Sequence, residues 1–171
     1  MLVLDRWIVS KTHDLQQQVI NEYDNYNFHF VMKAILNFCT NDLGGFYLDI
    51  IKDRQYTTQT DSLARRSAQS ALFHISHAMV RWLSPILTFT SEEIWQFLPG
   101  ASNESVFLQT WYEGLEGNFD NPVIEASRDI NTHLRKELED MRRNKIIGSS
   151  LDAEVDIYCK DDNYQNLLGL K

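Results

Sequence analysis

The apolar residues in residues 62–86 most constrain what this chain can fold into. They recur in steps of four and three, and most of them are alanine: Ala64, Ala68, Ala71, Ile75, Ala78, Trp82 and Ile86. That spacing places them along one side of a helix, where small side chains let a neighbouring helix approach closely. We therefore expect a helix that follows Asp61, packs in a bundle, and bends or ends at Pro85 because proline interrupts helical hydrogen bonding.

Similar stripes predict the other helices of an all-α, up-and-down bundle of four or five helices. The first runs from about Leu2 to Tyr23. The second opens after Asn27 and runs to about Arg54, because its apolar residues stay on one side of a single helix across Gly44-Gly45. That helix is either bent or straight at the two glycines. A break into two helices at Gly44 is the alternative, since glycine is a poor helix former. The core residues expected near the end of the second helix are Phe46, Leu48 and Ile50.

A short helix, a loop and a last long helix follow. Thr90-Ser-Glu-Glu93 fits a capping box and predicts the start of the short helix, which Pro99-Gly100 ends; residues 99–122 are mostly loop. Asn121-Pro122 predicts the last helix, which Gly148 ends. Residues 153–159 alternate like a strand, and a new helix begins after Asp161-Asp162. We expect residues 1–148 to form a helical domain and residues 149–171 to begin a small α/β unit.

Composition narrows the possible functions. The net charge of −8 over 171 residues argues against a general nucleic-acid coat, and against DNA as a partner, but it permits a local basic track. No apolar run reaches the roughly 18 residues of a membrane span, and the first residues lack a secretory signal. We therefore expect a cytoplasmic protein with no membrane partner.

Signatures of catalysis and metal binding are also absent from the sequence. There is no phosphate loop, no zinc-protease motif and no nucleophile elbow, so we expect no catalytic residue and no cofactor. Cys39 and Cys159 belong to no metal-binding cluster, and we expect both to be reduced. His74 and His77 stand three apart on one helix, but no third ligand is in sight, so they are expected at the surface and flank of that helix.

The positive charges are better organised than the acids. Arg128, Arg135 and Arg142 repeat every seven residues along one side of the last long helix, with Lys136 and Arg143 beside them and Lys145 beyond. Intrahelical pairing, for example through Glu139, is the plain explanation; a track for phosphates is the alternative. A second group of cations, expected to face outward at one end of the bundle, comprises Lys52, Arg54, Arg65 and Arg66.

Five blocks carry a family resemblance: LDRWIV (4–9), FYLDIIKDRQY (46–56), ARRSAQSALFHI (64–75), RWLSPILTFTSEEIW (81–95) and KIIGSSLDAEV (145–155). In this order they resemble the anticodon-binding region of bacterial isoleucyl-tRNA synthetases, which are class I aminoacyl-tRNA synthetases. The valyl, leucyl and methionyl relatives share the helical domain, and residues 46–56 favour the isoleucyl branch. Gly44-Gly45, and Asp152 in place of the usual Glu, depart from the family pattern.

The resemblance implies a module that holds the anticodon stem and loop of an isoleucine tRNA, within a larger ligase whose other domains are its second partner. It implies that ATP, Mg²⁺ and, in many bacterial members, zinc serve parts of the ligase that this sequence lacks, so the chain alone neither activates isoleucine nor hydrolyses ATP. A protein-interaction scaffold and the equivalent valyl domain are the alternatives. The candidate tRNA-binding residues are Lys52, Arg54, Tyr56, Arg65, Arg66, Arg128, Arg135, Arg142, Arg143 and Lys145.

Overall fold

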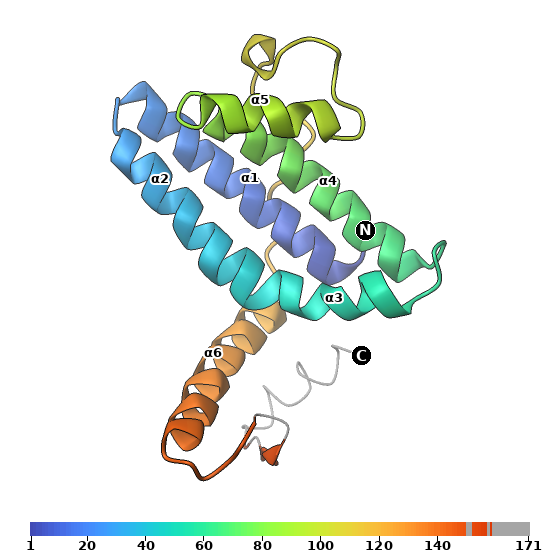
Figure 1. The fold of residues 1–171 in the computed structure, drawn as a ribbon, viewed down its shortest axis with the longest axis vertical. Helices are drawn as coiled ribbons and strands as arrows, with labels where there is room; N and C mark the ends of the chain where they lie inside the picture. Colours follow the sequence, from blue (N-terminus) through green and yellow to red (C-terminus); the bar gives the residue numbers. More distant parts are fainter. Residues whose placement is uncertain (150–151, 157, 159–171) are drawn as a thin grey trace. The chain divides into compact units, whose positions relative to one another are not determined.

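The computed structural model describes residues 1–149, 152–156 and 158. The chain divides into two compact units, Met1–Asp120 and Asn121–Lys171. The described residues are all-α, which confirms the expected fold class (Figure 1). The helical elements are α1 (Val3–Asp24), α2 (Phe28–Asn37), the π-helix η1 (Phe38–Tyr47), α3 (Leu48–Thr57), α4 (Leu63–Leu83), α5 (Thr88–Phe97), the 3₁₀ turn η2 (Val106–Leu108) and α6 (Pro122–Arg143).

The first unit is an up-and-down arrangement around α1. Short connections at residues 25–27 and 58–62 reverse the chain, and α1 contacts both α2 and α4. Figure 1 shows α1 lying between these two helices, with α5 crossing the end of α4. The chain passes from α2 through η1 into α3 without leaving helical backbone angles, so the expected single long helical path is confirmed.

The core of this unit lies where the alanine stripe of α4 meets α1. Ala68, Ala71 and Ala78 are fully buried, as are Trp7 of α1 and Trp82 of α4. Full burial of one large apolar side chain stabilises a fold by roughly 1.5–3 kcal/mol. The burial of these alanines confirms the expected close packing of α4. The helix ends at Leu83, two residues before Pro85, as expected.

The π-helix corrects the expected core of the second helix. Leu48 and Ile50 are 41% and 37% exposed, whereas Tyr47 and Ile51 are buried; Phe46 is buried as expected. In a π-helix each backbone bond spans five residues instead of four, so the buried stripe gains a residue relative to an α-helix. The stripe steps by five from Phe38 to Leu43 and then by four, which moves the core position from 50 to 51.

The expected start of α5 and the expected end of α6 are also wrong. α5 begins at Thr88, two residues before the proposed capping box, and its N-cap Leu87 makes no side-chain cap bond. α6 begins as expected, because the Asn121 side chain accepts hydrogen bonds from the backbone N–H of Val123 and Ile124 at 3.1 and 3.2 Å. It ends at Arg143 rather than at Gly148.

The end of α6 has a local cause. Lys145 adopts φ 57°, the left-handed conformation that usually favours glycine. Its N–H bonds to the carbonyl of Arg142, and the N–H of Ile146 bonds to that of Met141, so the last carbonyls of α6 are satisfied by a Schellman motif.

The expected C-terminal strand and helix find no support in the described residues. Residues 153–156 and 158 lie in no strand, and the remainder of that segment and the helix expected after residue 162 lie outside the described residues. The domain boundary expected at residue 148 stays a prediction. Every helix in the described part of the chain is too short or too polar to cross a membrane.

Candidate nucleic-acid interface

α6 presents the longest row of cations among the described residues. At 100° per residue, one half of the helix surface carries five cations and three carboxylates, a surplus of two positive charges. The other half carries Glu137 and Asp140. The cationic half comprises Arg128, Arg135, Lys136, Arg142 and Arg143, with Glu125, Asp129 and Glu139 among them.

Intrahelical pairing is present along this row. Arg142 Nε lies 3.0 Å from Glu139 Oε2, and Arg143 Nε lies 3.8 Å from Glu139 Oε1. Arg128 lies 3.6 Å from Glu125, and Arg135 Nε donates to the Asn131 amide oxygen at 2.8 Å. The plain explanation expected from the sequence is therefore confirmed for these side chains.

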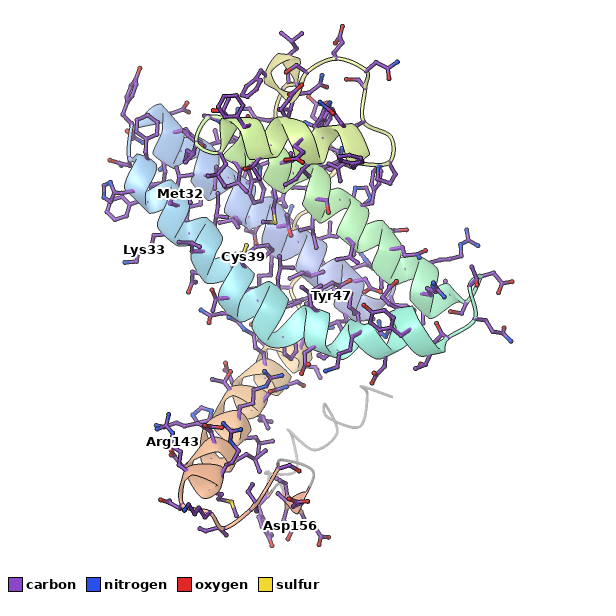
Figure 2. All side chains as sticks on the ribbon, in the orientation of Figure 1. Met32, Lys33, Cys39, Tyr47, Arg143 and Asp156 are labelled. Carbon is purple, nitrogen blue, oxygen red and sulfur yellow. The ribbon has the colours of Figure 1, made fainter. Side chains whose placement is uncertain are left out.

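Pairing does not neutralise the row, because Glu139 serves two arginines. Arg142 and Arg143 remain largely exposed (Figure 2 labels Arg143). The hydrogen bond from Arg142 lowers the pKa of the Glu139 carboxyl. Exposed pairs of this kind contribute little to stability and exchange readily with solvent ions. The guanidinium groups therefore stay accessible to a stronger anion.

The second group of candidates lies where α3 ends and α4 begins, as expected. Tyr56 is 86% exposed, and Arg66 is exposed on the first turn of α4. Lys52 Nζ lies 2.6 Å from Asp49, and Arg65 Nη1 donates to the carbonyl of Thr58 at 3.4 Å. Lys52 and Arg65 therefore make local contacts, whereas Tyr56 presents an open aromatic face.

Arg54 is directed toward a buried acid, which corrects its expected outward position. Its Nη1 lies 3.6 Å from Asp5 Oδ2, and Asp5 is 0% exposed. The Tyr47 hydroxyl donates to Asp5 Oδ1 at 2.7 Å and the Ser67 hydroxyl donates to Oδ2, while Ser67 accepts from the backbone N–H of Leu2. Burial, with the bond to Asp5, raises the pKa of the Tyr47 phenol. This network joins α1, η1, α3 and α4.

The sequence interpretation missed Asp5, Tyr47 and Ser67. Asp5 falls between Leu4 and Ile8 in the apolar stripe of α1, and an acid in such a stripe needs hydrogen-bonding partners when it is buried. The place of this acid in an apolar stripe was the feature of the sequence that could have revealed the buried network. Its partners come from residues 42 and 62 positions away.

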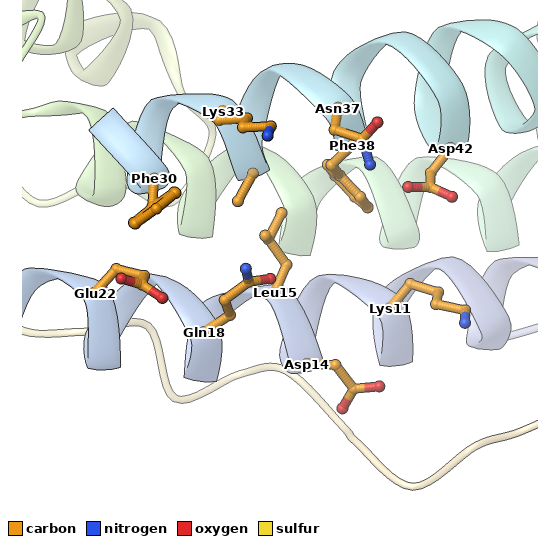
Figure 3. A pocket seen from close by; sticks show the side chains of 11 residues that line it. Lys11, Asp14, Leu15, Gln18, Glu22, Phe30, Lys33, Asn37, Phe38 and Asp42 are labelled. Carbon is orange, nitrogen blue, oxygen red and sulfur yellow. The ribbon is translucent and has the colours of Figure 1, made fainter. Parts of the chain in front are cut away.

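The groove between α1 and α2 is less suited to an anion. It has a volume of about 520 Å³ and continues along the start of η1. Figure 3 shows side chains facing each other across it, including Leu15 of α1 and Phe38 of η1. Acids outnumber lysines around it by three to two: Asp14, Glu22 and Asp42 against Lys11 and Lys33. Phosphate groups would meet no surplus of positive charge there.

The two histidines have hydrogen-bond partners within the protein. His77 is 3% exposed and its Nε2 donates to the carbonyl of Pro99 at 2.8 Å, which corrects its expected surface position. His74 Nδ1 lies 2.8 Å from the Tyr112 hydroxyl, and burial lowers the pKa of His74. The described residues hold no cluster of three or more metal-ligating side chains.

Comparison with known proteins agrees with these features. Residues 5–157 match the family model described as the anticodon-binding domain of tRNA ligase. The isoleucine–tRNA ligase of Ruthia magnifica subsp. Calyptogena magnifica is 61% identical over 167 residues, which cover 98% of this chain and 18% of that ligase.

Two further relatives carry the same name. The isoleucine–tRNA ligase of Vesicomyosocius okutanii subsp. Calyptogena okutanii is 52% identical over 93% of this chain and 20% of that ligase. The corresponding ligase of Ectopseudomonas mendocina is 53% identical over 99% of this chain and 19% of that ligase. The chain spans about a fifth of the length of the curated relatives it matches. With nearly its whole length matched by the family model, the chain belongs to the anticodon-binding domain family of tRNA ligases.

Proposed function

We propose that this chain is the tRNA-anticodon-binding module of an isoleucine–tRNA ligase. It positions an isoleucine tRNA for ATP-dependent aminoacylation in a catalytic domain that lies outside this sequence. The observation that carries the proposal is the family match over residues 5–157, with curated isoleucine–tRNA ligases at 52–61% identity. Their names favour isoleucine over valine as the amino acid.

The rest of the ligase supplies the cofactors in this proposal. ATP and Mg²⁺ serve the catalytic domain, and zinc, where present, belongs to a C-terminal cysteine cluster. As part of such a ligase the module acts in the cytoplasm and contacts neither DNA nor membrane. Its partners are the isoleucine tRNA and the other domains of the ligase.

The cations of α6, with Lys145 just beyond it, are the proposed contacts with the phosphates of the RNA backbone; we call them the α6 row. The surplus of two positive charges on one half of α6 supports this role, and so does the exposure of Arg135, Lys136, Arg142, Arg143 and Lys145. A phosphate can replace Glu139 or Glu125 as the partner of an arginine and receive two parallel N–H bonds from one guanidinium. Arg128 is the least accessible member of the row.

The group at the α3–α4 end is the proposed contact with unstacked bases. Anticodon-loop bases stack on aromatic side chains and are read on their edges, and each stacked base contributes roughly 1–3 kcal/mol. Tyr56 supplies the open ring, and Arg66 is an exposed cation on the first turn of α4. Lys52, Arg54 and Arg65 complete the proposed group, with Arg54 held by Asp5.

A titration with a labelled isoleucine-anticodon stem-loop tests the proposal. We expect weak binding whose logarithmic salt dependence has a slope of about −0.7 per phosphate contact. The double substitution Arg135→Ala and Arg142→Ala should flatten that slope by about 1.4, because it removes two contacts. Lys11→Ala with Lys33→Ala is the control, since it removes the same charge from the α1–α2 groove.

Each possible result separates the hypotheses. Equal salt slopes for the parent and the arginine double variant would remove the α6 row from the interface. No binding by this chain, beside clear binding by a full-length ligase, would favour a protein-contacting scaffold. Tighter binding of a valine-anticodon stem-loop would favour the valyl alternative.

A further inference from the structure

The outer side of α5 carries two phenylalanines that almost entirely face solvent. Phe89 is 90% exposed and Phe97 is 80% exposed. They stand eight residues apart with Glu93 midway, so the three side chains line one side of the helix over about 12 Å. We call these three residues the α5 ridge. Exposed apolar patches on a protein surface can mark sites of protein–protein interaction.

The inner side of α5 fixes the direction of this ridge. Trp95 is buried against Val80 and Val106, and its indole N–H donates to the carbonyl of Glu104 at 2.8 Å. The Arg81 guanidinium lies 4.6 Å from the centre of the Trp95 ring. With α5 anchored in this way, rotation of the helix cannot bury Phe89 and Phe97 within the described unit.

The charges of α5 favour a protein partner over RNA. Thr88–Phe97 contains two glutamates and neither lysine nor arginine. The Glu92 carboxylate accepts hydrogen bonds from the Ser105 hydroxyl and the Val106 N–H, which leaves Glu93 to face outward. Proteins that stack bases on aromatic rings place cations beside the rings to hold the backbone, and here a phosphate would meet a carboxylate.

We propose that the α5 ridge docks into a groove of the surrounding ligase polypeptide. The groove would offer two apolar pockets about 12 Å apart, flanking a lysine or arginine that meets Glu93. This inference rests on the proposed function, because the occupant is the remaining four-fifths of a ligase of which this chain matches about a fifth. A helix that lays spaced apolar anchors into a groove is a recurrent mode of recognition.

Hydroxyl-radical footprinting tests the docking directly. The isolated chain and a full-length isoleucine–tRNA ligase that carries this segment are oxidised in parallel, and labelling is read for each side chain by mass spectrometry. We expect labelling of Phe89 and Phe97 to fall about tenfold in the full-length ligase, as for anchors seated in desolvated pockets. Leu36, an exposed side chain of α2, serves as the reference.

Three outcomes would overturn the proposal. Equal labelling of the two phenylalanines in both proteins would show that nothing covers the ridge. Protection that appears in the isolated chain as its concentration rises would identify a second copy as the occupant. Protection of the full-length ligase that requires added tRNA would identify RNA.

Substitutions separate docking from folding and from RNA binding. Phe89→Ser with Phe97→Ser should lower the Tm of the full-length ligase while leaving that of the isolated chain unchanged, and Leu36→Ser should change neither. An equal loss of Tm in both proteins would assign the ridge to folding and refute docking. The stem-loop salt slope of the isolated chain should not respond to the double substitution, so failure of RNA binding and failure of docking are read separately.

Discussion

The glycine pair in η1 offers a test whose sign depends on the π-helix. In an ordinary helix, replacing a glycine by alanine stabilises the protein by about 1 kcal/mol. In η1, a Cβ on Gly45 would lie 2.8 Å from the carbonyl oxygen of Thr40, and a Cβ on Gly44 would lie 3.0 Å from that of Cys39. Both oxygens belong to the backbone five residues earlier and cannot swing aside. We therefore expect Gly45→Ala to destabilise.

The expected magnitude follows from two opposing contributions. Forcing an extra methyl group into a packed site costs about 1–3 kcal/mol, and the helix preference of alanine returns about 1 kcal/mol. The net loss for Gly45→Ala is therefore about 1 kcal/mol, whereas Gly44→Ala, with the longer contact, falls closer to neutral. With a urea m-value of about 2 kcal/mol/M, the Gly45→Ala midpoint falls by about 0.5 M.

Urea unfolding followed by tryptophan fluorescence measures this shift, because Trp7 and Trp82 are buried in the same unit. The pair Gln69→Ala and Gln69→Gly, at an exposed site of α4, calibrates the alanine–glycine difference in a regular helix. A Gly45→Ala midpoint that rises by as much as this calibration would refute the close approach of the Thr40 carbonyl, and the π-helix with it.

Three further predictions follow from other contacts. Asp5→Ala should lower the free energy of unfolding by about 3 kcal/mol, because it leaves buried donors without an acceptor. Tyr47→Phe should lower it by about 2 kcal/mol, because it removes one hydrogen bond to a carboxylate. Urea unfolding measures both changes, and an Asp5→Ala variant as stable as the parent would contradict the network. Lys145→Gly should stabilise α6 by about 1 kcal/mol, since glycine adopts positive φ without strain, yet weaken stem-loop binding; opposite signs in calorimetry and RNA titration are the expected pattern. Burial lowers the folded-state pKa of His74 below its ordinary 6.5, so the unfolded state binds the proton more readily and Tm should fall as pH drops below about 6.5; His74→Gln should flatten that fall.

The parts of the fold that follow a regular period were predictable from the sequence. The alanine stripe of α4 and the Asn121-Pro122 start of α6 involve neighbours two to four residues apart, which a sequence displays directly. The end of α6 was missed because Lys145, rather than a glycine, takes the left-handed conformation. The core of α3 was missed because a five-residue step differs by one position from the four-residue step of a plain helix.

The candidate interface was predictable only as a set of charges. The seven-residue spacing of Arg128, Arg135 and Arg142 placed them correctly on one side of α6. Nothing local to Arg54 indicated its turn toward Asp5, because that pair joins residues 49 positions apart. Long-range pairing of this kind depends on how the helices pack against one another, and the residue spacing within a single helix does not determine that packing.

The π-helix makes chain length, rather than composition, decide which side chain meets the buried acid. Inserting one residue into η1 would rotate α3 by about 100° relative to α2. Ile50 would then take the place of Ile51, and Asp53 the place of Arg54, so that a second carboxylate would confront Asp5. An insertion of one residue in this loop-free stretch would thus act at a distance, because it would reverse the sign of the charge presented to the interior. Relatives that have one residue more there should differ at position 5 as well.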